Sequence, residues 1–298
     1  MKNLTQSTFS LAIAFVLLWN SGFIGAEYGL PYTGTFTLLF WRYAVLSLLL
    51  LIYLTISKKL VWHDLNTVSH TSIVGILAHG VWLSCVLLAL EQNVPAGIVA
   101  LVVALQPLAT GAFSGLIAGE RTKLWQWLGL IVGFLGVAIA VGTRIQVNNE
   151  VSPIGYFLPF GSVIAITIAS LIQRRREISP KNYPSLSVAN TLFYQSFATT
   201  LVMAIPAVTV EELMIQWNFP LIATLTWLIL GVSLAAYGLM WKLLSRLDAT
   251  RVASLFYLGP PVTMVMAWLA FGDIPQVGDL IGLVVVTAGV LLVQSTSN

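Results

Sequence analysis

Long apolar runs alternate with short polar connectors along the whole chain of 298 residues. A helix that crosses a lipid bilayer needs about 20 mostly apolar residues, at a rise of about 1.5 Å each. Ten runs meet this requirement, so the pattern predicts an all-α polytopic membrane protein with ten transmembrane helices. The expected spans are residues 8–26, 35–57, 71–90, 95–117, 124–142, 152–173, 187–206, 221–242, 249–271 and 277–294.

Two stretches are ambiguous in this pattern. The run at residues 9–26 follows Lys2 as a signal peptide would, but it lacks a small-x-small cleavage site and equally apolar runs follow it. We therefore interpret it as the first spanning helix. Residues 209–220 mix two acids with apolar and aromatic residues. This stretch is either a short helix on the outer surface or an ordinary loop with interfacial aromatics, and both interpretations stay open.

The same pattern occurs twice, at a constant offset of 153 residues. The offset aligns Pro107 with Pro260, Gly119 with Gly272, Glu120 with Asp273, and Gly129 with Gly282. We therefore predict two five-helix repeats, at residues 1–145 and 150–298. Because five is odd, the second repeat enters the membrane in the opposite sense. Inverted repeats of this kind are typical of transporters that open a central site to either side in turn.

Lysine and arginine indicate which connectors stay in the cytoplasm, because these residues avoid translocated loops. When the connectors are numbered alternately, twelve of the fourteen fall on one side, Arg144 falls on the other, and Arg42 lies inside a span. We therefore expect a multi-pass protein of the bacterial inner (cytoplasmic) membrane with cytoplasmic N- and C-termini. The basic triplet at residues 174–176 is interpreted as a topology determinant rather than a patch for lipid or nucleic acid.

The composition excludes several classes of protein. The chain is 58% hydrophobic and 8% charged, against about 25% charged residues in soluble domains. It carries no familiar catalytic motif or phosphate-binding glycine loop, so we expect neither an enzyme nor an organic cofactor. A single cysteine, Cys85, excludes an internal disulfide and a cysteine metal cluster. The expected partners are the lipid bilayer and a small-molecule substrate, without nucleic acid.

Glycines recur on the fifth and tenth expected spans. Gly129, Gly133 and Gly136 share one face of the fifth span, and Gly282 and Gly289 recur in the tenth. Small residues let helices approach closely in lipid, where packing drives association. We therefore expect these two spans to pair, either as a scaffold within the chain or as the contact of a homodimer.

Several sequence blocks together resemble a known family. They are Leu17–Phe23, Phe40–Tyr43, the set Ala100, Pro107 and Gly119–Glu120, the glycines Gly129 and Gly136, and the second copies of the last two blocks. In order and spacing they are similar to the ten-helix EamA-type permeases of the drug/metabolite transporter superfamily, over essentially the whole chain. The resemblance implies two homologous halves and the export or exchange of small metabolites, often amino acids or related compounds. Gln195 stands at the position of Arg42, and Ile172 at that of Trp19, so the halves are not equivalent.

Arg42 is the clearest candidate for a functional residue. It lies seven residues into the second span, or about 10 Å along the helix axis. Because arginine stays charged inside a membrane, it needs a carboxylate, a wet cavity or a route to the headgroups. We expect Glu27 as its first partner and Glu91 as its second. Arg42 either attracts a substrate carboxylate or holds an outer gate, or it forms a structural ion pair.

Other polar and aromatic residues lie at depths where transporters bind ligands. His79, near the middle of the third span, either carries a coupling proton or hydrogen-bonds a neighbouring helix. Trp82 is expected to share its face, and Gln106 and Tyr257 lie beside prolines that interrupt the backbone bonds of their helices. Trp241 is interpreted as an interface anchor. The predicted substrate-binding residues are Trp19, Asn20, Arg42, His79, Trp82, Gln106, Tyr237 and Tyr257, with no metal ligand among them.

These patterns predict a secondary transporter that exports small metabolites such as amino acids by alternating access. It has no recognisable ATP site, so the expected energy source is a proton or substrate gradient. Proton-coupled efflux of lipophilic drugs is the main alternative, weakened because no carboxylate is expected at mid-membrane. A channel is a further alternative. A membrane-embedded enzyme or scaffold acting on lipids would need a cluster of His, Asp or Glu at one depth, which the pattern does not offer.

Overall fold

Helices make up nearly all of the chain that the computed structural model describes, namely residues 6–92, 94, 99, 102–142, 153–178, 186–272 and 276–295. Within that part, eight helices are long and apolar enough to cross a membrane, and a shorter apolar helix spans Leu124–Ile139. The prediction of an all-α polytopic membrane protein is confirmed. The first part of the expected span 95–117 lies largely outside the described residues.

The elements follow the expected spans closely. Three spans contain a π-helical or 3-10 segment (η) between two α-helices. The bounds are α1 Gln6–Gly29, η1 Leu30–Tyr32, α2 Thr35–Ile56, α3 Leu65–Gly75, η2 Ile76–Val81, α4 Trp82–Glu91, α6 Gln106–Ile117, α7 Leu124–Gly142, α8 Pro153–Ile178, α9 Val188–Thr209, α10 Phe219–Trp227, η3 Leu228–Ala236, α11 Tyr237–Leu244, α12 Ala249–Ser254, η4 Leu255–Leu258, α13 Gly259–Phe271 and α14 Val277–Ser295.

The third span begins six residues earlier than the apolar pattern predicts. Asp64 is the N-cap of α3, and its carboxylate accepts a hydrogen bond from the Thr67 amide at 3.1 Å. A cap of this kind satisfies a helix-terminal N–H group, so a polar segment can extend an apolar helix. Hydrogen bonds from the Thr67 hydroxyl and amide also lower the pKa of Asp64.

Residues 210–218 form a loop, so the interpretation as a surface helix is wrong. Ile215 makes an isolated antiparallel bridge with Thr33, and the Gln216 amide donates to the Tyr32 carbonyl at 2.9 Å. Glu212 and Leu213 have φ values of 52° and 54°, a region that a helix does not use. The loop thereby attaches the end of α9 to the connection before α2.

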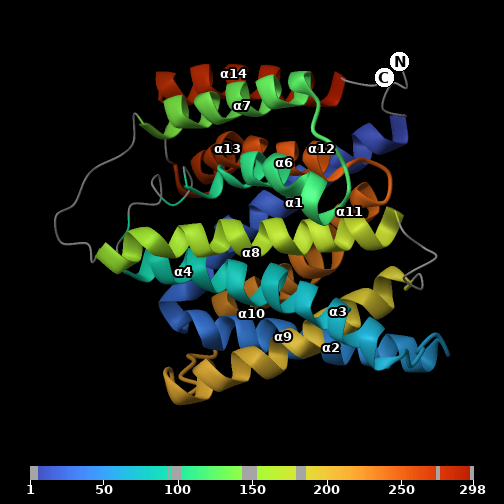
Figure 1. Cartoon of the computed structure of the whole chain (residues 1–298). Coiled ribbons are helices and arrows are strands. Elements are labelled where there is room, and N and C mark those ends of the chain that lie inside the picture. The colour runs from blue at the N-terminus through green and yellow to red at the C-terminus, as the bar shows by residue number, and fades with distance from the viewer. Residues whose placement is uncertain are drawn as a thin grey trace.

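The offset of 153 residues relates elements as well as sequence blocks. It carries α2 onto α9, η2 onto part of η3, α6 onto α13 and α7 onto α14. Two pairs of equivalent helices, α2 with α9 and α7 with α14, pack against each other. In Figure 1 the second pair lies along one edge of the molecule and the first pair along the opposite edge, with the other helices between them. This is the arrangement expected of two halves related by a pseudo-two-fold axis.

The equivalent helices run in opposite directions. At one end, Tyr194 near the start of α9 donates from its hydroxyl to the Val61 carbonyl, which follows α2, at 2.8 Å. At the other end, Glu211, just after α9, accepts from the Phe36 and Thr37 amides at the start of α2, at 2.9 and 2.7 Å. Because α2 and α9 occupy the same place in their repeats, their antiparallel packing confirms that the repeats are inverted.

The glycines of the fifth and tenth spans serve contacts inside the chain. A Cβ atom added to Gly289 on α14 would lie 2.4 Å from the Gly133 nitrogen on α7, and one added to Gly129 would lie 2.7 Å from the Gly289 carbonyl oxygen. No side chain fits at such separations, so these glycines allow the two backbones to approach. Of the two interpretations left open, the scaffold within the chain is the one observed.

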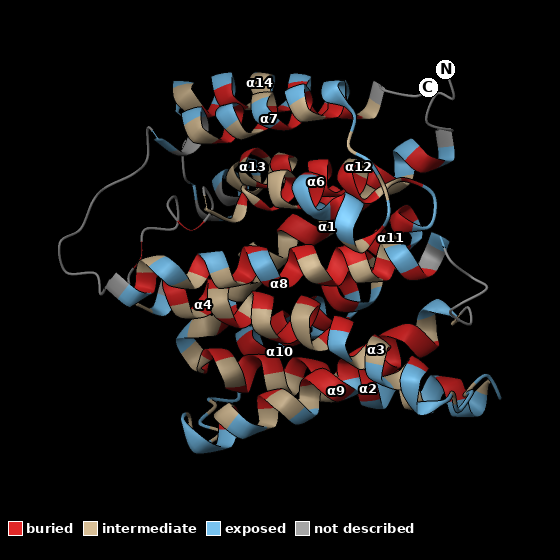
Figure 2. Cartoon of the chain, viewed as in Figure 1, coloured by how far each residue is buried: buried red, intermediate tan, exposed pale blue. Residues whose placement is uncertain are grey.

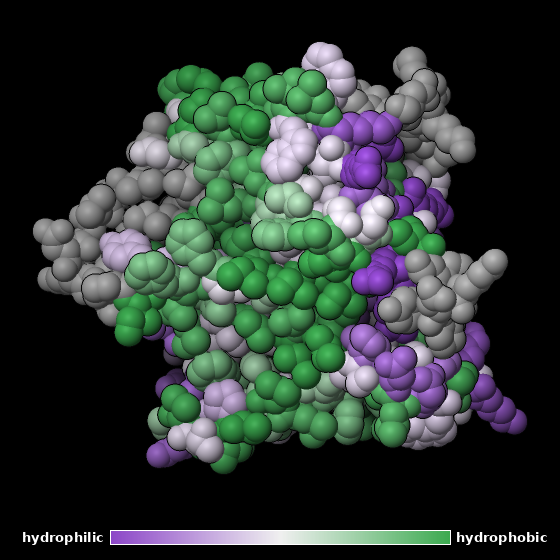
Figure 3. All heavy atoms as spheres, viewed as in Figure 1, coloured by the Kyte–Doolittle hydropathy of each residue, from purple (hydrophilic) through white to green (hydrophobic). Residues whose placement is uncertain are grey.

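The surface is apolar around the middle of the bundle. Buried residues gather on the helix sides that face other helices (Figure 2), and large apolar residues such as Leu135 and Val284 are exposed on the outside. On the face seen in Figure 3, hydrophilic residues gather mainly at the end where α1 begins and α14 ends. An apolar surface with polar ends suits a molecule whose solvent is lipid.

Candidate functional site

A small cavity of about 30 Å³ lies between the two halves. Its walls come from the second half of α1, the first turns of α2, α4, and the η3–α11 segment of the second repeat. These positions place it between the centre of the bundle and the end where α2 begins. The lining residues are Trp19, Gly22, Phe23, Ala26, Leu38, Leu39, Arg42, Trp82, Leu83, Val86, Leu87, Leu228, Val232 and Tyr237.

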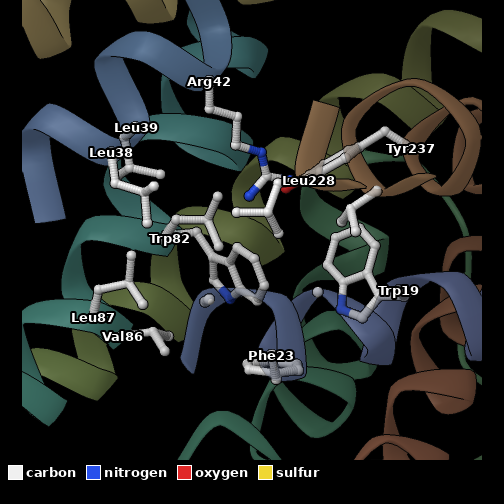
Figure 4. A pocket seen from close by; sticks show the side chains of 14 residues that line it. Trp19, Phe23, Leu38, Leu39, Arg42, Trp82, Val86, Leu87, Leu228 and Tyr237 are labelled. Atoms are coloured by element: carbon white, nitrogen blue, oxygen red, sulfur yellow. The ribbon is translucent and has the colours of Figure 1, made fainter. Parts of the chain in front are cut away.

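Aromatic rings form one side of the cavity (Figure 4). The ring centroid of Trp19 lies 5.3 Å from that of Trp82 and 4.7 Å from that of Tyr237, in tilted geometry. Phe256 closes the cluster from behind, 5.0 Å from Trp19. Contacts of this kind fix the orientation of each ring. The cavity therefore brings together three residues that the sequence predicts to bind substrate, namely Trp19, Trp82 and Tyr237.

Arg42 is the charged residue of the described lining. Its Nε donates to the Ser233 hydroxyl at 2.7 Å, and its Cζ lies 5.3 Å from the centre of the Tyr43 ring. Only 4% of the residue is exposed, and its Nη2 is buried without a hydrogen-bond partner. In Figure 4 the side chain extends from α2 toward Trp82 and Leu228.

The observed partner of Arg42 is the Ser233 hydroxyl and not the carboxylate of Glu91. Glu91 instead accepts from the Thr35 amide at 3.0 Å and from the Thr35 hydroxyl at 2.7 Å, at the start of α2. Helix N-termini attract carboxylates because their first N–H groups are unpaired. The expectation of Glu91 as partner is therefore wrong, and the side chain of Glu27 lies outside the described residues.

His79 lies just behind the cavity, in the π-helical segment η2. Its Nε2 is 3.2 Å from the Gln195 side-chain oxygen, and its ring packs edge-on against Tyr237 at a centroid distance of 4.1 Å. Its Nδ1 is buried without a partner. Of His79 and Trp82, only Trp82 lines the cavity. The π-helical turn is wider than an α-turn, so residues three apart no longer share a face as predicted.

The polar contacts at the centre follow the pseudo-symmetry of the halves. Adding 153 to 42 gives Gln195, and subtracting 153 from 233 gives Gly80, next to His79. Arg42 on α2 thus bonds the π-helical segment of the second half, while Gln195 on α9 bonds that of the first half. Each repeat sends one polar side chain into the other repeat. The offset of 153 residues predicts that these positions are equivalent in the two halves, although it did not identify Ser233 or Gln195 as site residues.

Tyr237 and Trp241 make further polar contacts at the centre, beside His79 and Gln195. The Tyr237 hydroxyl donates to the Ala78 carbonyl at 2.6 Å, in the segment where π-helical winding changes the backbone pairing. Trp241 is buried and its indole N–H donates to the Gln195 oxygen at 3.2 Å. The interpretation of Trp241 as an interface anchor is therefore wrong, because its polar edge bonds inside the bundle rather than at the membrane surface.

Three predicted site residues lie away from the cavity. The Asn20 amide bonds the Val16 carbonyl at 2.7 Å and its oxygen accepts from Thr263 at 3.2 Å, which connects α1 to α13. Gln106 is buried in the first turn of α6. Tyr257 packs so closely that a Cβ on Gly133 would lie 2.5 Å from its ring. Their substrate-binding role stays a prediction, without a place in the cavity lining.

Contacts of Glu120 connect several elements at the end opposite the cavity. This residue follows Gly119, whose φ of 71° forms the turn between α6 and α7. The Arg174 Nε donates to one Glu120 oxygen at 2.7 Å, and the Ala249 amide donates to the other at 3.1 Å. A second nitrogen of Arg174 donates to the Leu244 carbonyl at 2.6 Å. The Gly-acid turn of the first repeat thus binds both α8 and the α11–α12 corner of the second.

The side chains that could hold a metal ion are dispersed. Among the described residues, no group of three or more His, Cys, Asp or Glu side chains is arranged to coordinate one.

Comparison with known proteins places these features in context. A model of the EamA-like transporter family matches residues 6–142 and again residues 153–295. An uncharacterized transporter of Bacillus subtilis, YvbV, is 24% identical over 205 residues, which cover 68% of this chain and 65% of that protein. A crystal structure of 19% identity superposes with a TM-score of 0.76 and covers 96% of each chain, which supports the fold alone.

Two further relatives match nearly the full length. A probable amino-acid metabolite efflux pump of Salmonella typhimurium is 20% identical over 288 residues, covering 95% of this chain and 93% of that protein. A probable terminal-alkyne amino-acid exporter of Streptantibioticus cattleyicolor is 27% identical over 302 residues, covering 98% and 94%.

Proposed function

The chain belongs to the EamA-like transporter family, and from this premise we propose that it exports small metabolites such as amino acids by alternating access. The inverted repeats supply two halves that can exchange conformations around a central site. The observation that carries the proposal is the cavity between those halves, where a buried Arg42 lies beside an aromatic cluster. The full-length relatives named as an amino-acid metabolite efflux pump and an amino-acid exporter support the substrate class.

The size of the cavity supports a carrier rather than a channel. A volume of about 30 Å³ is far below the roughly 300–1,000 Å³ of pockets that enclose a small-molecule ligand. A metabolite therefore enters only when the halves move apart, as alternating access requires. At the opposite end, Glu120 connects Arg174 on α8 with the start of α12, and breaking these contacts would let the elements separate on that side.

The cavity also argues against lipophilic drugs as the main substrate. A buried guanidinium attracts anions and repels the cationic groups that many such drugs carry. In the described cavity lining the charged side chain is Arg42. Proton-coupled drug efflux therefore remains the alternative that fits the cavity less well.

We assign substrate contact to Trp19, Arg42, Trp82 and Tyr237, with His79 and Gln195 as the layer that orients them. We further propose that the two functional halves are residues 1–145 and 150–298, and that the protein lies in the bacterial inner membrane. The basic residues support cytoplasmic N- and C-termini.

The test is counterflow in proteoliposomes that contain the purified protein. Vesicles loaded with a mixture of amino acids are expected to show saturable uptake of labelled amino acid, stimulated by the internal pool. Arg42→Ala is expected to reduce this flux about tenfold or more, because a charge-assisted contact contributes about 1.5–3 kcal/mol. Arg246→Ala, which changes an exposed residue at the other end, is the matched control and should retain the flux.

Two outcomes would contradict the proposal. Non-saturable flux without counterflow stimulation would indicate a channel. Full activity of a folded Arg42→Ala protein would remove Arg42 from the site. If Arg42→Ala does not fold, Arg42→Lys keeps the charge but loses the geometry of the Ser233 bond, and an intermediate flux is then expected.

A further inference from the structure

Two residues that line the cavity each carry a buried N–H donor without a hydrogen-bond partner. These donors are Nη2 of Arg42 and Nε1 of Trp82, and each residue is only 4% exposed. Buried polar groups are almost always paired, so each unpaired one asks for an explanation. Arg42 comes from α2 and Trp82 from α4, and both residues line the same cavity.

Both atoms can only donate. A guanidinium has five N–H donors and no acceptor, and an indole nitrogen is likewise a donor only. Whatever satisfies them must therefore present acceptor atoms, and beside a buried positive charge the favoured acceptor is an anion. A carboxylate meets both requirements, because it has two oxygens and a negative charge.

The guanidinium is held in place before any ligand arrives. Its Nε bond to Ser233 measures 2.7 Å, and the Tyr43 ring lies beneath it at 5.3 Å. These contacts restrict the side chain, which lowers the entropy lost when a ligand binds. The neighbouring walls are apolar, with Phe23, Leu38 and Val86 among them, so they fit the hydrocarbon body of a ligand.

We propose that the cavity recognises its substrate through the carboxylate, bound by the Arg42 guanidinium and the Trp82 indole N–H, and that a free amino group is not required. The substrate class is then apolar monocarboxylates, which includes apolar amino acids and also the 2-oxo acids with the same side chains. The inference deepens the proposed function and rests on it. An ammonium group is tolerated because it can lie over an aromatic face such as that of Trp19.

The same geometry rejects ligands that lack the carboxylate. An amine has no oxygen to accept from the two N–H donors, and a carboxamide has one neutral oxygen where a carboxylate has two that share a negative charge. Sites built to satisfy specific hydrogen bonds discriminate strongly against analogues that leave buried partners unpaired. Removing the carboxylate should therefore weaken binding of the ligand more than removing the amino group does.

A matched ligand panel on the wild-type protein tests this inference. In proteoliposomes, uptake is measured for L-phenylalanine, phenylpyruvate, L-phenylalaninamide and phenethylamine, and for leucine with 4-methyl-2-oxopentanoate. The expected result is transport of each oxo acid within about tenfold of its amino acid, since the shared carboxylate supplies most of the binding free energy. The amide and the amine should show no saturable uptake.

A variant isolates the second donor. Trp82→Phe keeps an aromatic ring but removes the N–H, and it is expected to raise KM for the carboxylates about three- to tenfold with little change in kcat. Trp125→Phe, at a residue with 59% exposure, is the control and should leave KM unchanged. A loss of folding alone would reduce the amount of active protein without changing KM.

The outcomes separate the inference from the proposed function. Transport of phenylalanine and leucine without their oxo acids would overturn the inference and leave amino-acid export intact. Equal transport of phenethylamine would also overturn it, as would an unchanged KM in folded Trp82→Phe. If none of the six compounds moves while the amino-acid mixture still shows counterflow, the inference is overturned and the proposed function stands; if the mixture shows no counterflow either, both are overturned.

Discussion

Single side chains connect the two halves of the molecule at its centre. Gln195 accepts from His79 and from Trp241 through one oxygen atom, and its symmetry counterpart Arg42 bonds Ser233. Such buried polar contacts stabilise only when both partners are present, because an unpaired buried donor costs about 1–3 kcal/mol. The contacts therefore position the cavity wall as well as hold the halves together.

Replacing Gln195 tests this residue-scale coupling. Gln195→Leu keeps the volume but removes the acceptor of two buried donors, so we expect the melting temperature in detergent to fall by several degrees. Gln216→Leu changes an exposed glutamine and should leave it unchanged. Equal melting temperatures for the two variants would show that the Gln195 contacts contribute nothing to stability.

Whole elements recur between the halves, including their departures from regular winding. The π-helical segments η2 and η3 occupy matching places in the two repeats, and both face the centre of the bundle through buried residues such as His79 and Ser233. At the edge, α7 and α14 meet through glycine contacts. In lipid, where water exclusion does not hold helices together, such backbone approach is the main source of pairing.

One added methyl group tests the pairing of α7 with α14. Gly289→Ala places a Cβ 2.4 Å from the Gly133 nitrogen, so the helices must separate, and we expect a lower melting temperature and earlier aggregation on heating. Gly142→Ala is the control, since a Cβ there meets nothing within 4 Å and alanine favours the helix. A Gly289→Ala protein as stable as the control would mean that this approach is not required.

The molecule as a whole has two chemically different ends. One end gathers basic residues from the α6–α7 turn, the end of α8 and the α11–α12 corner, where Arg174 binds Glu120. At the other end, Glu91 and Glu211 cap α2. Basic residues resist translocation, so the first end is expected in the cytoplasm and the cavity lies nearer the outer end.

Reporter fusions test this orientation of the whole molecule. Alkaline phosphatase, which is active only outside the cytoplasm, should be active when fused after Glu212 and inactive when fused after Lys123 or at the C-terminus. A green fluorescent protein fused at the C-terminus should fluoresce. The opposite pattern of activities would reverse the assignment of both ends.

The apolar runs and the offset of 153 residues were enough to predict the helices and the two inverted repeats, and the distribution of lysine and arginine predicts a sidedness that the reporter fusions test. These properties are local or additive, since a helix needs length and hydrophobicity and orientation follows a sum of charges. The depth of Arg42 and Trp19 in their helices could be obtained in the same way.

The partners of those residues depend on how each helix is rotated and how closely helices approach, which no single segment determines. The tertiary structure alone gave Arg42 a serine from the other half rather than Glu91, and placed Asn20 against α13 instead of the cavity. It also introduced the π-helical segments that separate His79 from the face of Trp82. Hydrogen bonds and cavities arise between segments distant in the sequence, so they were decided only when the helices packed together.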